Sequence, residues 1–273
     1  IYKIIYINLY MNTKVVAYSN KKLDGFGSVY LCCMNAFATA RYDKQLYYHT
    51  NFNDLNGKSL HHNYNNDKNY SSIMNEFTGL KTDSSYNESI EIDYRNSNKG
   101  GGGGGSQGGF RISFPDKYYT ESVIKELRYY YYSTSKPNPI ECDIAVHIRR
   151  GDIAKKNPKT NKSDSERYIK LEYIKNLLEE IDPHKKKRIA IFSQGKDSDF
   201  DEINNSNTDL YINYDLQITF HSMVRAPILI TSPSMLSVTA ALLNENTIYY
   251  TNWGGFGKLK HWILKNHKDY IQS

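Results

Sequence analysis

The second half of the chain alternates between short apolar runs and stretches with helical spacing. Each apolar run is rich in Ile, Val and Leu, which is typical of buried strands. The expected strands are 144–149, 187–193, 228–231 and 247–250, and the expected helices are 216–225, 233–243 and one after Ser163. Strands that alternate with helices favour a parallel sheet. The sequence therefore predicts an α/β fold with a parallel sheet in its C-terminal half.

The helix expected after Ser163 has both a start signal and an apolar face. Ser163 and Glu166 have the spacing of a capping box. The apolar residues that follow at one-face spacing are Ile174, Leu177, Leu178 and Ile181. This helix is expected to cover one face of the sheet.

The 273 residues are enough for two modest domains. The Pro/Asn-rich stretch at 136–139 marks the expected boundary. We predict an N-terminal α/β domain at 1–138, on the acceptor side, and a C-terminal Rossmann-like nucleotide-sugar-binding domain at 139–273. A glycine-rich tract near 96–109 is expected to be a flexible insertion, native or engineered.

The first half opens with a strand, a glycine loop and a helix, as nucleotide-binding halves do. The strand is expected at 14–18, the loop at 20–28 and the helix at 29–42. Further expected elements are a strand at 45–49 and helices at 72–80 and 120–133, with the rest of 51–98 polar and irregular. The apolar segment 1–10 favours a strand over a signal peptide.

The most specific short segment is Ile144–Asp152, a strand that ends in His147, Arg149, Arg150, Gly151 and Asp152. Open α/β sheets bind ligands at the carboxyl ends of strands. Two guanidiniums at such an end suit phosphate oxygens. The alternative is a strand end with solvated arginines and a core histidine.

A second strand end, at 228–237, leads directly into a helix. Ser232 is expected as the N-cap, with Pro233 in the first helical position. Free N–H groups and the positive dipole end favour an anion there. Thr231, Ser232 and Ser234 add hydroxyl donors, although an ordinary capped helix remains the alternative.

His147–Asp152 resembles the His-x-Arg-Arg-Gly-Asp motif of the α1,2-, α1,6- and protein O-fucosyltransferase superfamily, and the similarity is strongest over 142–241. The resemblance implies the GT-B fold, in which two Rossmann-type domains face each other across a cleft. It further implies GDP-fucose as donor, inversion at the anomeric carbon, no metal or other cofactor, and a hydroxyl of a glycan or protein as acceptor. It places Arg149 at the diphosphate.

The same resemblance extends to other positions. His221 matches a histidine of a later motif, while Thr219 stands where an acid is frequent. Asp24–Ser28 is similar to a glycine loop of the family, with Ser28 in place of asparagine. The catalytic candidates are Arg149, Asp152 and Asp24, and the donor-binding candidates are His147, Arg150, Gly25, Gly27, Ser28, Ser193, Gln194, His221, Thr231, Ser232 and Ser234.

The general base is left open between Asp24 and Asp152. A carboxylate beside two guanidiniums is a poor base, because their charge favours its ionised form and lowers its pKa. Orienting Arg149 or Arg150 is therefore the better role for Asp152.

Composition sets the remaining bounds. The net charge of +6 suits an anionic ligand, but acids and bases are interspersed, so no nucleic-acid partner is expected. The three cysteines have neither disulfide nor metal spacing. Asp197 and Asp199 form an Asp-x-Asp pattern, for which acids at a helix start are the favoured explanation over a metal. No apolar run is long enough to span a bilayer.

The compartment is open. A cytoplasmic location is favoured, and the secretory lumen fits if an anchor was removed. Two other functions are also left open. One is a degenerate nucleotide-sugar-binding protein, suggested by Ser28 and Thr219. The other is a basic nucleic-acid-binding module, suggested by the tyrosine run at 129–132.

Overall fold

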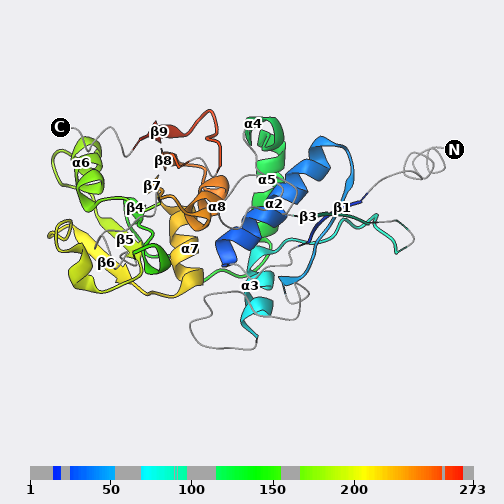
Figure 1. Ribbon diagram of the computed structural model, residues 1–273, viewed down its shortest axis with the longest axis horizontal. Coiled ribbons are helices and arrows are strands. Elements are labelled where there is room, and N and C mark those ends of the chain that lie inside the picture. The colour runs from blue at the N-terminus through cyan, green and yellow to red at the C-terminus, as the bar shows by residue number, and fades with distance from the viewer. Residues whose placement is uncertain are drawn as a thin grey trace, which may run out of the picture. The chain divides into compact units, whose positions relative to one another are not determined.

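A computed structural model of the chain describes residues 15–19, 25–52, 69–88, 90, 92–96, 115–154, 167–253 and 256–266, with the backbone alone at 18, 19, 93–96, 152 and 154. The chain forms two compact units, Ile1–Ser135 and Lys136–Ser273. Each unit contains a parallel sheet flanked by helices (Figure 1). The α/β class and the parallel sheet of the C-terminal half are confirmed.

The N-terminal unit has a three-stranded sheet in the order β2-β1-β3, with both pairings parallel. Its strands are β1 (Val15–Ser19), β2 (Leu46–Tyr48) and β3 (Ile92–Asn96). Its helices are α2 (Phe26–Tyr42), α3 (Tyr70–Thr78), α4 (Pro115–Tyr118) and α5 (Glu121–Tyr132). Helix α2 is buried along most of its length and packs on β1, β2, α4 and α5, so it forms the centre of this unit.

Two features of this unit differ from expectation. Strand β3 lies in the stretch expected to be irregular, because its polar composition hides its pairing with β1. Helix α2 begins at Phe26 rather than at 29, because the carbonyl of Gly25 accepts hydrogen bonds from the N–H groups of Ser28 and Val29. The expected strand at 1–10 and the tract at 97–109 lie outside the described residues.

The C-terminal unit has a six-stranded sheet in the order β6-β5-β4-β7-β8-β9, with every neighbouring pair parallel. Its strands are β4 (Ile144–His147), β5 (Ile189–Ser193), β6 (Thr208–Ile212), β7 (Ile228–Ile230), β8 (Thr247–Thr251) and β9 (Ile263–Lys265). Its helices are α6 (Leu171–Ile181), α7 (Leu216–Arg225) and α8 (Met235–Leu243), with the short 3₁₀ helices η2 (Gly151–Ala154) and η3 (Asp197–Phe200).

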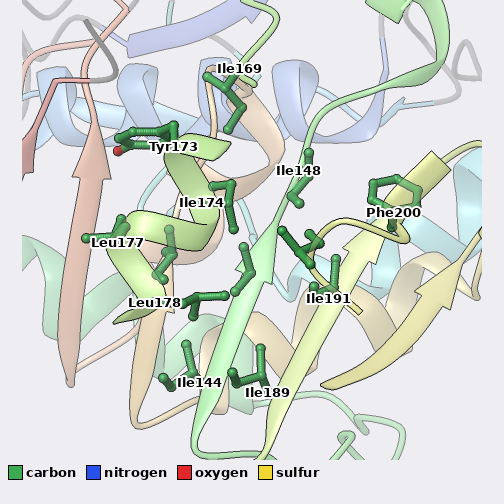
Figure 2. Packing of buried hydrophobic residues seen from close by; sticks show 13 residues of the cluster. Ile144, Ile148, Ile169, Tyr173, Ile174, Leu177, Leu178, Ile189, Ile191 and Phe200 are labelled. Atoms are coloured by element: carbon green, nitrogen blue, oxygen red, sulfur yellow. The ribbon is translucent and has the colours of Figure 1, made fainter. Parts of the chain in front are cut away.

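The apolar face of α6 packs on one face of this sheet. Its Tyr173, Ile174, Leu177 and Leu178 belong to one buried cluster with Ile144 of β4 and Ile189 of β5, and Figure 2 shows Ile174 and Leu178 beside β4. Because side chains alternate along a strand, Ile144 and Val146 point toward α6, whereas Ala145 and His147 point to the opposite face. Helices α7 and α8 pack against each other, and α7 contacts β4.

Several boundaries in this unit differ from expectation. Helix α6 begins at Leu171, after Lys170 in an extended conformation, and the expected capping box at Ser163 and Glu166 lies outside the described residues. Strands β6 and β9 were not predicted, since both are partly exposed edge strands without a continuous apolar run. No described helix has both the length and the hydropathy needed to cross a bilayer.

Candidate functional site

The order of strands in the C-terminal sheet defines where a ligand is expected. From β4 the chain adds β5 and β6 on one side, then returns to add β7, β8 and β9 on the other. This is the order of the doubly wound dinucleotide-binding sheet, and it places a topological switch point between β4 and β7. Ligands of open α/β sheets bind outside the carboxyl ends of the strands at such a point. The two strand ends singled out from the sequence are the two that flank it.

A hydrogen bond joins these two strand ends directly. The Nδ1 atom of His147, the last residue of β4, lies 2.9 Å from Oγ of Ser232, which follows β7. His147 is 8% exposed and Ser232 is fully buried. Burial, assisted by the nearby charge of Arg149, lowers the pKa of His147 to about 3. His147 is therefore a neutral group that ties the two loops together, and we regard it as a positioning residue rather than a donor-binding one.

The two arginines of the motif have different surroundings. Arg150 is 5% exposed and donates to the carbonyls of Arg149 and Ile169, each at 3.0 Å. Its guanidinium also lies 4.2 Å from the centre of the Tyr168 ring. Arg149 is partly exposed and close enough to His147 for its charge to act on the imidazole. Arg150 thus holds the loop, and Arg149 is the better placed of the two to meet a ligand.

The turn after β5 packs against the turn after β4. Gly151 has φ +67°, and a Cβ atom there would lie 2.3 Å from Oε1 of Gln194. The hydroxyl of Ser193 donates to the carbonyl of Ile148 at 2.6 Å, so Ser193 fixes the main chain of the motif. Gln194 is partly exposed. Of the two residues expected here, Gln194 remains a candidate for ligand contact, and the Ser193 hydroxyl has an internal role.

The helix after β7 starts two residues later than predicted. Ser234 is the N-cap of α8, and its hydroxyl accepts a hydrogen bond from the N–H of Leu236 at 3.3 Å. The assignment of Ser232 as N-cap was wrong, because its side chain is bonded to His147 instead. Pro233 therefore precedes the cap rather than occupying the first helical position. The positive end of α8 still lies at this turn.

The three hydroxyls expected to meet phosphate are engaged within the protein. Thr231 accepts from the N–H of Thr251 at 3.1 Å and thereby continues the pairing of β7 with β8. Like Ser232 and Ser234, Thr231 is buried. These side chains shape the turn, so a phosphate there would meet chiefly main-chain N–H groups and the helix dipole.

The structure adds Arg167, which the sequence analysis did not select. Its Nε donates to the carbonyl of Pro233 at 3.0 Å, and its guanidinium lies 4.8 Å from the centre of a Trp253 ring. No sequence signal distinguishes Arg167 from other basic residues in a polar loop. Its position beside the start of α8 becomes visible only in the fold.

The structure places His221 away from the motif arginines along α7. The chain runs from the end of α7 at Arg225 into β7, so His221 lies about one turn from the amino-terminal edge of the sheet. Burial, then the charges of Lys136 and Arg225, lower the pKa of His221 to about 4. The donor-binding assignment of His221 therefore lacks support from its position.

The remaining site candidates divide between the two units. Gly25, Gly27 and Ser28 form the start of α2 in the N-terminal unit. Asp24 lies outside the described residues, and only the backbone of Asp152 is described. The roles proposed for these residues stay predictions.

The acidic run near Asp197 and the tyrosine run at 129–132 lie in different surroundings. Asp199 accepts from the N–H of Lys196 at the start of η3, in line with a helix-start role. Within the described ranges, no three His, Cys, Asp or Glu side chains are grouped so that they could hold a metal ion. In the tyrosine run, Tyr131 is fully buried against Phe77 and Tyr129 is 73% exposed, so these residues do not form one exposed stacking surface.

No protein-family model and no curated protein matches the chain. The chain is similar to two solved structures of the heptosyltransferase WaaC of E. coli, each alignment covering 93% of both chains. The structure with ADP-2-deoxy-2-fluoro heptose gives 9% identity and a TM-score of 0.40, and the structure with ADP gives 10% and 0.46.

Proposed function

We propose that this protein is a glycosyltransferase that binds a nucleotide sugar at the switch point between β4 and β7. The observation that carries the proposal is the hydrogen bond between His147 and Ser232. It joins the arginine loop to the turn before α8, the two elements whose chemistry suits a diphosphate. If these two elements lay far apart, the arginine loop would be an ordinary strand end and the turn before α8 an ordinary helix start, and neither would indicate a diphosphate site.

Arg149 is proposed as the catalytic cation. When the bond between sugar and phosphate breaks, negative charge grows on the leaving diphosphate. A fixed guanidinium there stabilises the transition state more than the ground state. Arg150 supports this role, because its bond to the Arg149 carbonyl fixes the backbone that carries the guanidinium.

The finer assignment rests on the motif at 147–152. We propose that the donor is GDP-fucose, that transfer inverts the anomeric carbon, and that Arg149 and the start of α8 bind the diphosphate without a metal. The acceptor is proposed to be a hydroxyl of a glycan or protein. Gln194 is proposed to face the nucleoside, because it follows β5, the strand beside β4. The base stays open between Asp24 and Asp152.

The test is a thermal-shift and calorimetric screen of the full chain against GDP-fucose, GDP, ADP and UDP, with and without a chelator. We expect binding of GDP and GDP-fucose that is insensitive to the chelator. Arg149→Ala should lose it and retain the fold. The matched control is Arg188→Ala, which removes an exposed charge at the amino-terminal edge beside β5. Wild-type affinity in Arg149→Ala would refute the role of Arg149.

A second function is a nucleotide-sugar-binding protein without turnover. Ser28 lies in the first turn of α2, where the resembled family usually has asparagine. The serine side chain is shorter than that of asparagine, so its polar group reaches less far from the backbone. Binding of GDP-fucose with neither transfer nor hydrolysis of the donor would favour this function over catalysis.

A further inference from the structure

Three loop segments contact one another at the carboxyl edge of the C-terminal sheet. Arg150 reaches from the β4 loop to the carbonyl of Ile169 and the ring of Tyr168. The next residue back along the chain, Arg167, donates to the carbonyl of Pro233 in the turn before α8. That turn returns to β4 through Ser232. The 167–169 segment is therefore bonded to two other loops, the one after β4 and the turn before α8.

We propose that Arg167 is a second phosphate-binding residue, which contacts the terminal phosphate of the diphosphate beside the start of α8. The inference rests on the proposed function and extends it by naming a further residue of the same site. Arg149 lies beside His147, the partner of Ser232, and Arg167 is bonded to the adjacent residue, Pro233. Both arginines are thus linked to the turn at Ser232 and Pro233, Arg149 through its neighbour His147 and Arg167 by a direct hydrogen bond.

The contacts of Arg167 suit such a role in two ways. A guanidinium presents planar N–H donors whose geometry matches phosphate oxygens, and the bond from Nε to the Pro233 carbonyl fixes the orientation of that plane. The Trp253 ring, 4.8 Å away, restricts the side chain further. Because these contacts already order the side chain, binding phosphate loses less conformational entropy than a mobile arginine would.

The alternative is that Arg167 serves packing alone, by joining the 167–169 segment to Pro233 and Trp253. The two roles differ in one measurable property. A contact to the terminal phosphate, which the monophosphate lacks, must strengthen the binding of a nucleoside diphosphate relative to the monophosphate. A packing role must affect both nucleotides alike, or affect stability without changing that ratio.

The experiment is calorimetric titration of the full chain with GDP and with GMP. Two neutral variants, Arg167→Gln and Arg167→Met, are compared with wild type and with the control Arg188→Gln, which removes an exposed charge at the other edge of the sheet. We expect the ratio of the GMP to the GDP dissociation constant to fall about tenfold or more in the Arg167 variants, as for loss of a charge-assisted hydrogen bond. The control should keep the wild-type ratio.

The outcomes separate this inference from the proposed function. If wild type binds neither nucleotide, the proposed function fails and this inference fails with it. If Arg149→Ala loses GDP while the Arg167 variants keep the wild-type ratio, only the role of Arg167 is overturned. Failure of both neutral variants to fold would assign Arg167 a structural role and likewise overturn the proposal.

Discussion

The buried hydrogen bond between His147 and Ser232 predicts how the stability of the C-terminal unit changes as the pH is lowered. Burial lowers the pKa of His147 to about 3, whereas an unfolded histidine titrates near 6.5. Between about pH 6.5 and 3 the unfolded chain therefore binds more protons at this position than the folded chain does. Stability from this residue is complete above the unfolded pKa and is lost as pH falls through that window. At pH 4.5, two units below the unfolded value, the loss is about 3 kcal/mol.

The variant that isolates this effect is His147→Asn, which keeps a hydrogen-bonding group near the Nδ1 position and removes the titration. Both tryptophans of the chain, Trp253 and Trp262, belong to the C-terminal unit, so their fluorescence during urea unfolding reports that unit. We expect wild type to lose about 3 kcal/mol more than the variant between pH 7 and 4.5. Other titrating groups occur in both proteins and cancel in this difference.

An exposed histidine provides the control for this measurement. His184→Asn replaces one exposed histidine of the same unit and leaves the hydrogen bond between His147 and Ser232 in place, so the larger loss of stability on acidification should persist. If His147→Asn lost stability with pH as steeply as wild type, His147 would not be held neutral by burial. A neutral, buried His147 would then not explain the hydrogen bond that joins the ends of β4 and β7.

Three further predictions concern stability. Leu177→Ala, at a fully buried position on the sheet-facing side of α6, should destabilise the C-terminal unit by about 2–5 kcal/mol, measured by tryptophan fluorescence in urea. Arg41→Met should destabilise the N-terminal unit by about 1–3 kcal/mol, because it leaves two part-buried carboxylates without their shared guanidinium. Circular dichroism is the assay there, since that unit has no tryptophan. Gly151→Ala should lower the free energy of unfolding by at least about 1 kcal/mol, because Gly151 has φ +67°. Adding Gln194→Ala should recover the part of this loss that comes from the clash with the Gln194 side chain. Equal stabilities of the single and double variants would contradict that contact.

The sequence predicted elements well where burial produces a simple repeat. Helix α7 was predicted with its observed bounds, and the α6 residues expected on one face are buried or partly buried in the core cluster. It predicted less where a strand depends on a distant partner. Strands β3, β6 and β9 are polar, short or at an edge, so their pairing leaves little trace in their own residues.

The two strand ends selected from the sequence are neighbours in the sheet, whereas several of their polar side chains make contacts that were not predicted. Both strand ends expected to bind phosphate flank the switch point. The sequence could not show which polar side chains would satisfy each other. Ser232 matched an N-cap by local pattern, yet its hydroxyl is bonded to His147, 85 residues away. Arg150 matched a ligand-binding arginine, yet its guanidinium holds backbone carbonyls.

By itself the sequence determined the α/β class, the parallel sheet and the two strand ends that carry polar residues, because apolar periodicity and turn residues act over a few positions. The tertiary structure decided which of those polar residues are turned inward, and it brought Arg167 to the start of α8. Those outcomes depend on contacts between distant segments, whose hydrogen bonds are formed only once the strands are adjacent in the sheet.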